Sequence, residues 1–282
     1  MSGAESLDHV GLCTRDGPAL WAAYEALGFQ LTPLARQSGR RAPGAPVEPF
    51  GTGNRCAMLR QGYLELLAIL DPALFDNRLG AFLDRYAGMH ILAFGIGGAE
   101  AELARLRRAG IDLPGVAHLE RPVDDPEGPR ARFSRLPLPD APEGRLQLIE
   151  HHTPELLWQP RWLEHPNHAV ALESAILVAP APAESAAALA RLTGQVLTPD
   201  PAGGYALALP RGLIRILPPA ALGAVLPGVT APDLPFLAGY TVRTDDGNAA
   251  VRALLGGRLR PVPGGLMAPP ELAGGAALVF TE

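Results

Sequence analysis

The sequence contains no lysine, so all 24 of its basic residues are arginine. This absence excludes Schiff-base chemistry on a lysine and the lysine of a Walker-type phosphate loop. Cysteine is scarce as well: Cys13 and Cys56 are the only two and lack the spacing of a metal-binding pair. We therefore expect two buried, reduced thiols rather than a disulfide or a cysteine metal site.

Long apolar runs and clustered positive charge are also missing. No stretch reaches the roughly 20 apolar residues that cross a bilayer, and the start of the chain lacks a signal-peptide pattern. The net charge of -5 comes with scattered arginines and no basic stripe. We therefore expect no membrane partner, no nucleic acid and a cytoplasmic location. The length of 282 residues and a hydrophobic content of 48% leave room for two domains.

What the sequence does contain is a repeat. Residues 62–72 read Gly-Tyr-Leu-Glu-Leu-Leu-Ala-Ile-Leu-Asp-Pro, and residues 144–154 read Gly-Arg-Leu-Gln-Leu-Ile-Glu-His-His-Thr-Pro, without a gap between the flanking Gly and Pro. Each copy predicts a short buried strand. Glu65 and Gln147 occupy the same place among aliphatic residues. A carboxylate there is costly to bury unless it is paired, hydrogen-bonded or bound to a metal.

The repeat belongs to a larger unit that occurs four times. The first unit predicts a strand at 7–12, a helix entered at Asp16, short strands near 30–34 and 54–60, and a strand at 63–70. Corresponding units begin at 88–94, 173–177 and 239–243. The glycine- and proline-rich residues 36–53 predict a loop. The sequence therefore predicts an α+β protein of four strand-helix-strand modules.

Two positions recur in each module, one in the first strand and one in the last. In the first two modules they hold nitrogen or oxygen ligands, namely His9, Glu65, His90 and Gln147. In the last two modules they hold Ser174, Arg215, Gly239 or its neighbour, and Leu278. No packing rule requires imidazoles in one pair of modules and their loss in the other, so this difference indicates a functional site in the first half.

The Asp8-His9-Val10-Gly11-Leu12 motif, the strand around Glu65 and the paired modules resemble the vicinal oxygen chelate superfamily, in particular its glyoxalase-like domain proteins. The resemblance implies four βαβββ modules paired into two tandem domains with curved mixed β-sheets. We expect a glyoxalase-like domain with a metal site at residues 1–155, a linker at 156–169 and a degenerate second domain at 170–282.

In that superfamily two modules enclose one divalent metal, and the matching ligands here are His9, Glu65, His90 and Gln147. Gln147 departs from the usual carboxylate, so Glu65 is the expected catalytic base. Glu150 is a second-choice ligand that requires a bulge, because period-two alternation turns it away. Such a ligand set suits iron, manganese, nickel, cobalt or zinc without discriminating among them. The candidates for substrate binding are Asn54, Arg55 and His151.

The resemblance implies a metal-dependent lyase or isomerase that acts on a small oxygenated substrate through a metal-bound enolate. Two alternatives stay open. His9, His90 and Glu65 could form the two-histidine, one-carboxylate triad of an extradiol-type dioxygenase. The chain could instead be a non-catalytic protein that binds or sequesters a small molecule. The second half offers a surface for a homodimer, the commonest assembly of soluble proteins.

Overall fold

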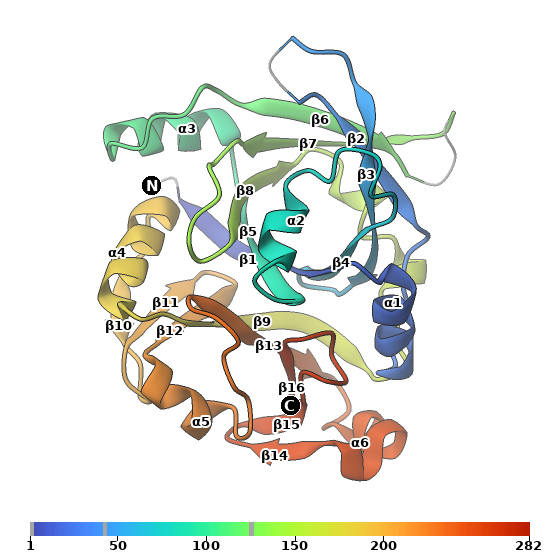
Figure 1. Ribbon diagram of the computed structural model, residues 1–282, viewed down its shortest axis with the longest axis vertical. Coiled ribbons are helices and arrows are strands. Elements are labelled where there is room, and N and C mark those ends of the chain that lie inside the picture. The colour runs from blue at the N-terminus through green and yellow to red at the C-terminus, as the bar shows by residue number, and fades with distance from the viewer. Residues whose placement is uncertain (1–2, 42–43, 124–126) are drawn as a thin grey trace.

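The computed structural model describes residues 3–41, 44–123 and 127–282. The chain folds into four successive βαβββ modules, with curved strands at the centre and most helices on the outside (Figure 1). The predicted α+β fold class is confirmed. No helix in the described ranges is long and apolar enough to span a membrane.

The first two modules form one half of the molecule. Module one contains β1 (Ala4–Thr14), α1 (Gly17–Ala26), β2 (Ala35–Gly39), β3 (Glu48–Met58) and β4 (Tyr63–Ile69). Module two contains β5 (Gly88–Ile96), α3 (Ala99–Arg108), β6 (Ala117–Pro122), β7 (Arg130–Leu136) and β8 (Arg145–His151). A short helix, α2 (Leu79–Leu83), is inserted between them. Figure 1 shows α2 in front of the curved strands of this half, whereas α1 and α3 lie at the periphery.

The last two modules form the other half. Module three contains β9 (Ala169–Val178), α4 (Pro182–Thr193), β10 (Leu197–Pro199), β11 (Tyr205–Leu209) and β12 (Gly212–Leu217). Module four contains β13 (Phe236–Thr244), α6 (Ala249–Leu255), β14 (Arg260–Val262), β15 (Gly265–Ala268) and β16 (Ala277–Thr281). The shorter elements are η1 (Pro154–Leu156), η2 (Pro160–Trp162), η3 (Pro219–Ala221), α5 (Leu222–Val225) and η4 (Gly256–Arg258).

Each half has a mixed sheet in which the first strand of a module pairs in parallel with the last. The first half has the order β2-β3-β4-β1-β5-β8-β7-β6, and the second half the order β10-β11-β12-β9-β13-β16-β15-β14. The two sheets join where β13 pairs with β5 through Leu237 and Met89. Because the main apolar core contains residues from all four modules, the halves pack as one body. The proposed domain boundaries remain predictions.

Local sequence explains where α1 begins and ends. Asp16 caps its N-terminus by accepting a hydrogen bond from the Ala19 amide at 3.0 Å, and Pro18 follows in the first turn. Leu20 and Tyr24 are buried on one face. Gly28 follows with a φ of 86°, a left-handed conformation that glycine adopts without steric cost.

The predicted loop at residues 36–53 was wrong for the parts that the structure describes, because strand β2 and the start of β3 lie there. Ala35 pairs with Asn54, and no strand occurs at 30–34. Pro49 is tolerated because β3 pairs there with β2 alone and its pairing with β4 begins at Thr52, so one side of the backbone at Pro49 needs no ladder partner. Residues 42–43 of that stretch lie outside the described ranges.

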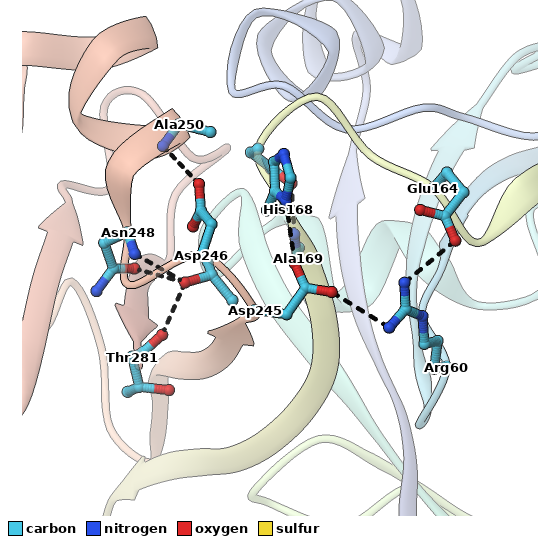
Figure 2. Close-up of polar contacts among 11 residues, drawn as sticks. Arg60, Glu164, His168, Ala169, Asp245, Asp246, Asn248, Ala250 and Thr281 are labelled. Atoms are coloured by element: carbon cyan, nitrogen blue, oxygen red, sulfur yellow. Dashed lines mark hydrogen bonds and ion pairs between the residues drawn. The ribbon is translucent and has the colours of Figure 1, made fainter.

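The predicted linker carries side chains that fix one half against the other. His165 donates from Nε2 to the Met58 carbonyl at 2.8 Å and accepts from the Gln30 amide at 3.0 Å. Figure 2 shows Arg60 between Glu164 and Asp245, at 3.2 Å from each. Asp245 also contacts His168 at 3.0 Å. Polar contacts thus accompany the apolar core between the halves.

Candidate functional site

A row of side chains crosses the curved sheet of the first half. The strand register aligns Tyr63 of β4, His9 of β1, Ala93 of β5 and Gln147 of β8. Residues paired directly across neighbouring strands share a face of the sheet. His9 and Gln147 therefore lie on one face, with Ala93 between them. The ring of Tyr63 stacks on His9 at a centroid distance of 4.3 Å.

A β-bulge in β1 lets two successive residues serve this face. Leu7 pairs with Phe94 and His9 pairs with Ala93, which leaves Asp8 as the extra residue. Asp8 Oδ1 lies 2.7 Å from His9 Nδ1, and Asp8 Oδ2 lies 3.1 Å from His151 Nε2. The Asp8 carboxylate thus joins an imidazole of β1 to an imidazole at the end of β8.

These contacts set the tautomers of both histidines. A carboxylate only accepts hydrogen bonds, so the proton must reside on His9 Nδ1 and on His151 Nε2. In the neutral imidazoles the lone pairs are then on His9 Nε2 and His151 Nδ1. Burial by itself raises the pKa of Asp8, but the hydrogen bonds from His151 and His9 outweigh burial and hold the pKa at about 2.

Glu65 of β4 lies next to this chain of contacts. Asn54 donates from Nδ2 to Glu65 Oε1, while Glu65 Oε2 lies 3.9 Å from His9 Nε2. His9 is 3% exposed and Glu65 is 9% exposed, so both groups are largely withdrawn from bulk water. Trp158 meets the rings of Tyr63 and His151 edge-on, at 5.9 and 5.0 Å. With the His9 ring in its neutral form, a carboxylate and an imidazole lone pair therefore face each other in a mostly buried setting.

His90 does not join this group. Because of a second register shift, Gly11 pairs with Ile91 and Leu12 with Met89, which leaves His90 as the extra residue of β5. The His90 ring stacks on Tyr86 at 4.1 Å, and Nε2 donates to the Tyr86 carbonyl at 2.8 Å. Its buried Nδ1 has no hydrogen-bond partner among the described residues. Burial lowers the pKa of His90 to about 4, so the ring is neutral at physiological pH.

The end of the sheet near His90 is filled by apolar side chains. Leu79 and Leu83 of α2 form a buried cluster with Cys13, Leu67 and Ile91. Gly11 lies under Ile91, because a Cβ at Gly11 would approach the Ile91 Cβ to 2.6 Å. The one buried charge at this end is Arg145 of β8, which pairs with Ile91 and donates to the Asn77 carbonyl at 2.7 Å, among the residues that the structure describes. His9, Glu65 and His151 lie at the other end.

The predicted substrate-binding residues are separated by strand alternation. Asn54 contacts Glu65, and His151 contacts Asp8, so both lie at the polar end. Arg55 lies on the other side of β3, where it pairs with Glu25 of α1 at 2.8 Å and donates to the Thr32 carbonyl at 2.9 Å. Since successive strand residues point to opposite faces, Arg55 cannot share the face of Asn54.

Sequence reasoning gave no role to Arg135 of β7, which the structure adds to this face. Ser134 lies on the α3 side of the sheet, because it pairs with Glu150, whose carboxylate accepts from the Ala99 amide at the start of α3 at 2.8 Å. Leu136 shares the face of Ser134. Arg135 alternates with them and points to the opposite face. Its neighbour Phe133 pairs with His151, and Arg135 itself pairs with Ile149. The sequence did contain a signal for this placement. In the strand Arg-Ala-Arg-Phe-Ser-Arg-Leu, period-two alternation puts Arg135 on the same face as Ala131 and Phe133, where an apolar residue is expected.

As placed, the four predicted ligands do not fit a single metal site. His9 and Glu65 converge, and Gln147 shares their face, but His90 is hydrogen-bonded to Tyr86 through Nε2. Within residues 3–41, 44–123 and 127–282, no three His, Cys, Asp or Glu side chains come together in a way that could hold a metal ion. The four-residue ligand set therefore stays a prediction.

The profile of the family described as "Glyoxalase-like domain" matches residues 7–193, which include all the residues of this site. The chain belongs to the glyoxalase-like domain family. The match extends from β1 through the first two modules into α4. Among curated proteins, none matches the sequence.

Solved structures extend the likeness over the whole chain of this glyoxalase-like protein. A hypothetical protein from Staphylococcus aureus has 11% identity and a TM-score of 0.68, with 97% of each chain covered. The Mn(II)-bound glyoxalase from Novosphingobium aromaticivorans has 12% identity and a TM-score of 0.53, covering 99% of this chain and 82% of its own.

Homoprotocatechuate 2,3-dioxygenase from Arthrobacter globiformis has 15% identity and a TM-score of 0.52, covering 99% of this chain and 80% of its own. The resemblance to the vicinal oxygen chelate superfamily is confirmed. At these identities the solved structures establish the fold alone.

Proposed function

We propose that this glyoxalase-like protein is an isomerase or lyase in which Glu65 and His9 move a proton on a small oxygenated substrate. One observation carries the proposal. Glu65 Oε2 and the lone pair of His9 Nε2 face each other across 3.9 Å, beyond hydrogen-bond distance. Two proton acceptors in this position repel each other unless a proton or a donor group from a substrate lies between them.

The surroundings support roles for both groups in proton transfer. Asn54 occupies Glu65 Oε1 and leaves Oε2 to act as the base. Asp8 holds the proton of His9 on Nδ1, so that Nε2 can accept a proton, in the manner of an acid-base pair oriented by a third group. Positioned acid-base catalysis of this kind contributes about 10²–10⁴-fold to a rate.

The metal-bound enolate expected from the family resemblance enters no step of this proposal, because His90 is hydrogen-bonded elsewhere. The hydrogen bond of His90 also distinguishes the two alternatives, an extradiol-type dioxygenase and a non-catalytic binding protein. An extradiol-type triad requires His90 beside His9 and Glu65, whereas a binding protein requires no ligand set at all. The position of His90 therefore favours a binding protein as the second candidate function.

Hydrogen-deuterium exchange tests the proposal without knowledge of the full reaction. Small 2-hydroxy acids, 2-oxo acids and 2-hydroxy ketones are incubated with the protein in D₂O, and loss of the C–H signal is followed by NMR. We expect exchange with at least one class, slowed about 10²–10⁴-fold by Glu65→Gln. Glu164→Gln, at an exposed linker position, is the matched control.

Two results would overturn the proposal. One is exchange at the wild-type rate in Glu65→Gln, which would remove the proposed base. The other is the absence of exchange in every class, which would leave the small-molecule binding protein as the function.

A further inference from the structure

Two buried polar atoms without partners lie near each other on β7 and β8. Arg135 Nε and His151 Nδ1 are both inaccessible to solvent and have no hydrogen-bond partner among the described residues. Arg135 pairs with Ile149, two residues before His151 on β8, so the two side chains are diagonal neighbours on one face. Buried polar groups are normally hydrogen-bonded, so two adjacent exceptions single out this place on the sheet as a candidate binding site.

Among the residues that the structure describes, the Arg135 guanidinium forms no ion pair with a carboxylate. Asp140, the carboxylate that acts on its pKa, already bonds Arg145 at 3.2 Å and pairs with Arg78 at 3.1 Å. Burial lowers the pKa of Arg135, the positive charge of Arg145 lowers it further, and Asp140 acts against both. A guanidinium remains charged in proteins, so a partly buried one without a carboxylate carries a desolvation cost. An anionic ligand would offset this cost with charge-assisted hydrogen bonds.

His151 requires a second kind of group from the same ligand. Because Nε2 donates its proton to Asp8, the neutral ring presents a lone pair at Nδ1. A lone pair accepts a hydrogen bond and so selects a donor group, such as a hydroxyl. A ligand that satisfies both atoms must therefore carry an anion and a hydroxyl close together.

We propose that Arg135 and His151 bind a 2-hydroxycarboxylate, with the carboxylate on Arg135 and the hydroxyl on His151. The choice of substrate class rests on the proposed function, since His151 is joined through Asp8 to His9 and places such a ligand beside the proton-transfer pair. The binding itself is independent of any reaction. Inorganic phosphate at neutral pH also carries a negative charge and a hydroxyl, so it is the competing ligand that the experiment has to separate from a 2-hydroxycarboxylate.

Thermal unfolding tests this assignment with lactate, propionate, inorganic phosphate and sodium chloride at matched ionic strength. We expect lactate to raise the Tm of the wild-type protein by about 2 °C or more, and propionate to raise it less. Arg135→Met should lose the lactate response. Arg132→Met, an exposed residue on the opposite face of the same strand, should keep it.

Two further variants separate a ligand-binding role from a structural one. Without ligand, Arg135→Met should unfold at the wild-type Tm or above, because an apolar side chain replaces an unpaired buried charge. His151→Phe should respond equally to lactate and propionate, because the acceptor for the hydroxyl is gone. Arg135→Gln repeats the binding test if the methionine variant does not fold.

The assignment is overturned if lactate stabilises the wild type no more than sodium chloride does, or if Arg135→Met keeps the response. A response to phosphate alone also overturns it. Glu65→Gln should still respond to lactate, because Glu65 contacts neither Arg135 nor His151. Lactate binding without proton exchange would therefore refute the proposed function and leave this assignment standing.

Discussion

The hydroxyl groups of Tyr24 and Tyr240 meet in the core and join helix α1 of the first half to strand β13 of the second. Both tyrosines are fully buried. Tyr24 also donates to the Ala273 carbonyl at 3.2 Å. Since a hydroxyl has one proton, Tyr240 must then donate to Tyr24. The Tyr24 hydroxyl therefore takes part in two hydrogen bonds, whereas the Tyr240 hydroxyl takes part in one.

We expect Tyr24→Phe to cost more stability than Tyr240→Phe. The first change leaves both the Tyr240 hydroxyl and the Ala273 carbonyl without a partner, which costs about 1–3 kcal/mol for a buried group. The second leaves Tyr24 still bonded to Ala273 and costs about 1 kcal/mol. Urea unfolding of the single and double variants measures the difference. Equal losses in the two single variants would contradict this order of donation.

Asp8→Asn should destabilise the protein at neutral pH. An amide can accept from one histidine but presents N–H groups to the other, so one of the two hydrogen bonds is lost. The Asp8 pKa is lowered from 3.8 to about 2, which corresponds to about 2 kcal/mol of stability. A lowered pKa stabilises the fold above pH 3.8, and that stabilisation is lost as the pH falls through about 2.

Unfolding free energies at a series of pH values check this prediction. The difference between wild type and Asp8→Asn should stay constant down to about pH 4 and shrink below it. Asp84→Asn, which removes an exposed ion pair with Arg15, is the control and should cost less than about 1 kcal/mol. A difference that does not change with pH would mean that Asp8 is not charged in the fold.

His90 should make the protein sensitive to mild acid. Burial lowers its pKa from 6.5 to about 4, so the unfolded chain binds a proton between these values and the folded chain does not. Stability therefore falls as the pH drops from about 6.5 to about 4, by about 3 kcal/mol. His90→Gln should flatten this part of the profile, whereas His118→Gln, at an exposed position, should leave it unchanged. An unchanged profile in His90→Gln would contradict the buried, neutral state of the ring.

Periodicity was enough to predict the four modules, because strand and helix patterns depend on residues close in sequence. It also assigned Gln147 and His151 to one face, which the unbroken register of β8 agrees with. The bulges at Asp8 and His90 could not be predicted, since a bulge depends on how two distant strands pair. Each bulge changes the direction in which the neighbouring side chains point. This is why His9 and His90 occupy equivalent places in the sequence but different surroundings in the fold.

The same limit applies to Arg55 and Arg135. Both are arginines in strands of mixed polarity, and composition alone does not say which face of such a strand a helix covers. Arg55 lies against α1 and Glu25, whereas Arg135 lies on the face away from α3. The polar end of the first sheet is therefore a property of register and of which face each helix covers.

Added metal ions should not stabilise this protein through His90. To act as a ligand through Nε2, His90 would have to break its hydrogen bond to the Tyr86 carbonyl and leave the stacked ring of Tyr86. We therefore expect manganese, iron(II), nickel, cobalt or zinc to change the Tm of the wild type and of His90→Gln equally. A true site would raise Tm with the free metal concentration, in proportion to RT ln(1 + [L]/Kd).

The informative comparison adds a His9→Ala variant to the same titration. A Tm rise that is lost in both His9→Ala and His90→Gln would contradict our expectation, because it would require the bulge of β5 to rearrange and bring His90 to His9. A rise that is lost in His9→Ala alone would indicate a metal held by His9 and Glu65 without His90. A rise that persists in both variants would come from exposed histidines such as His118, and would leave the polar end of the sheet to proton transfer by the protein's own groups.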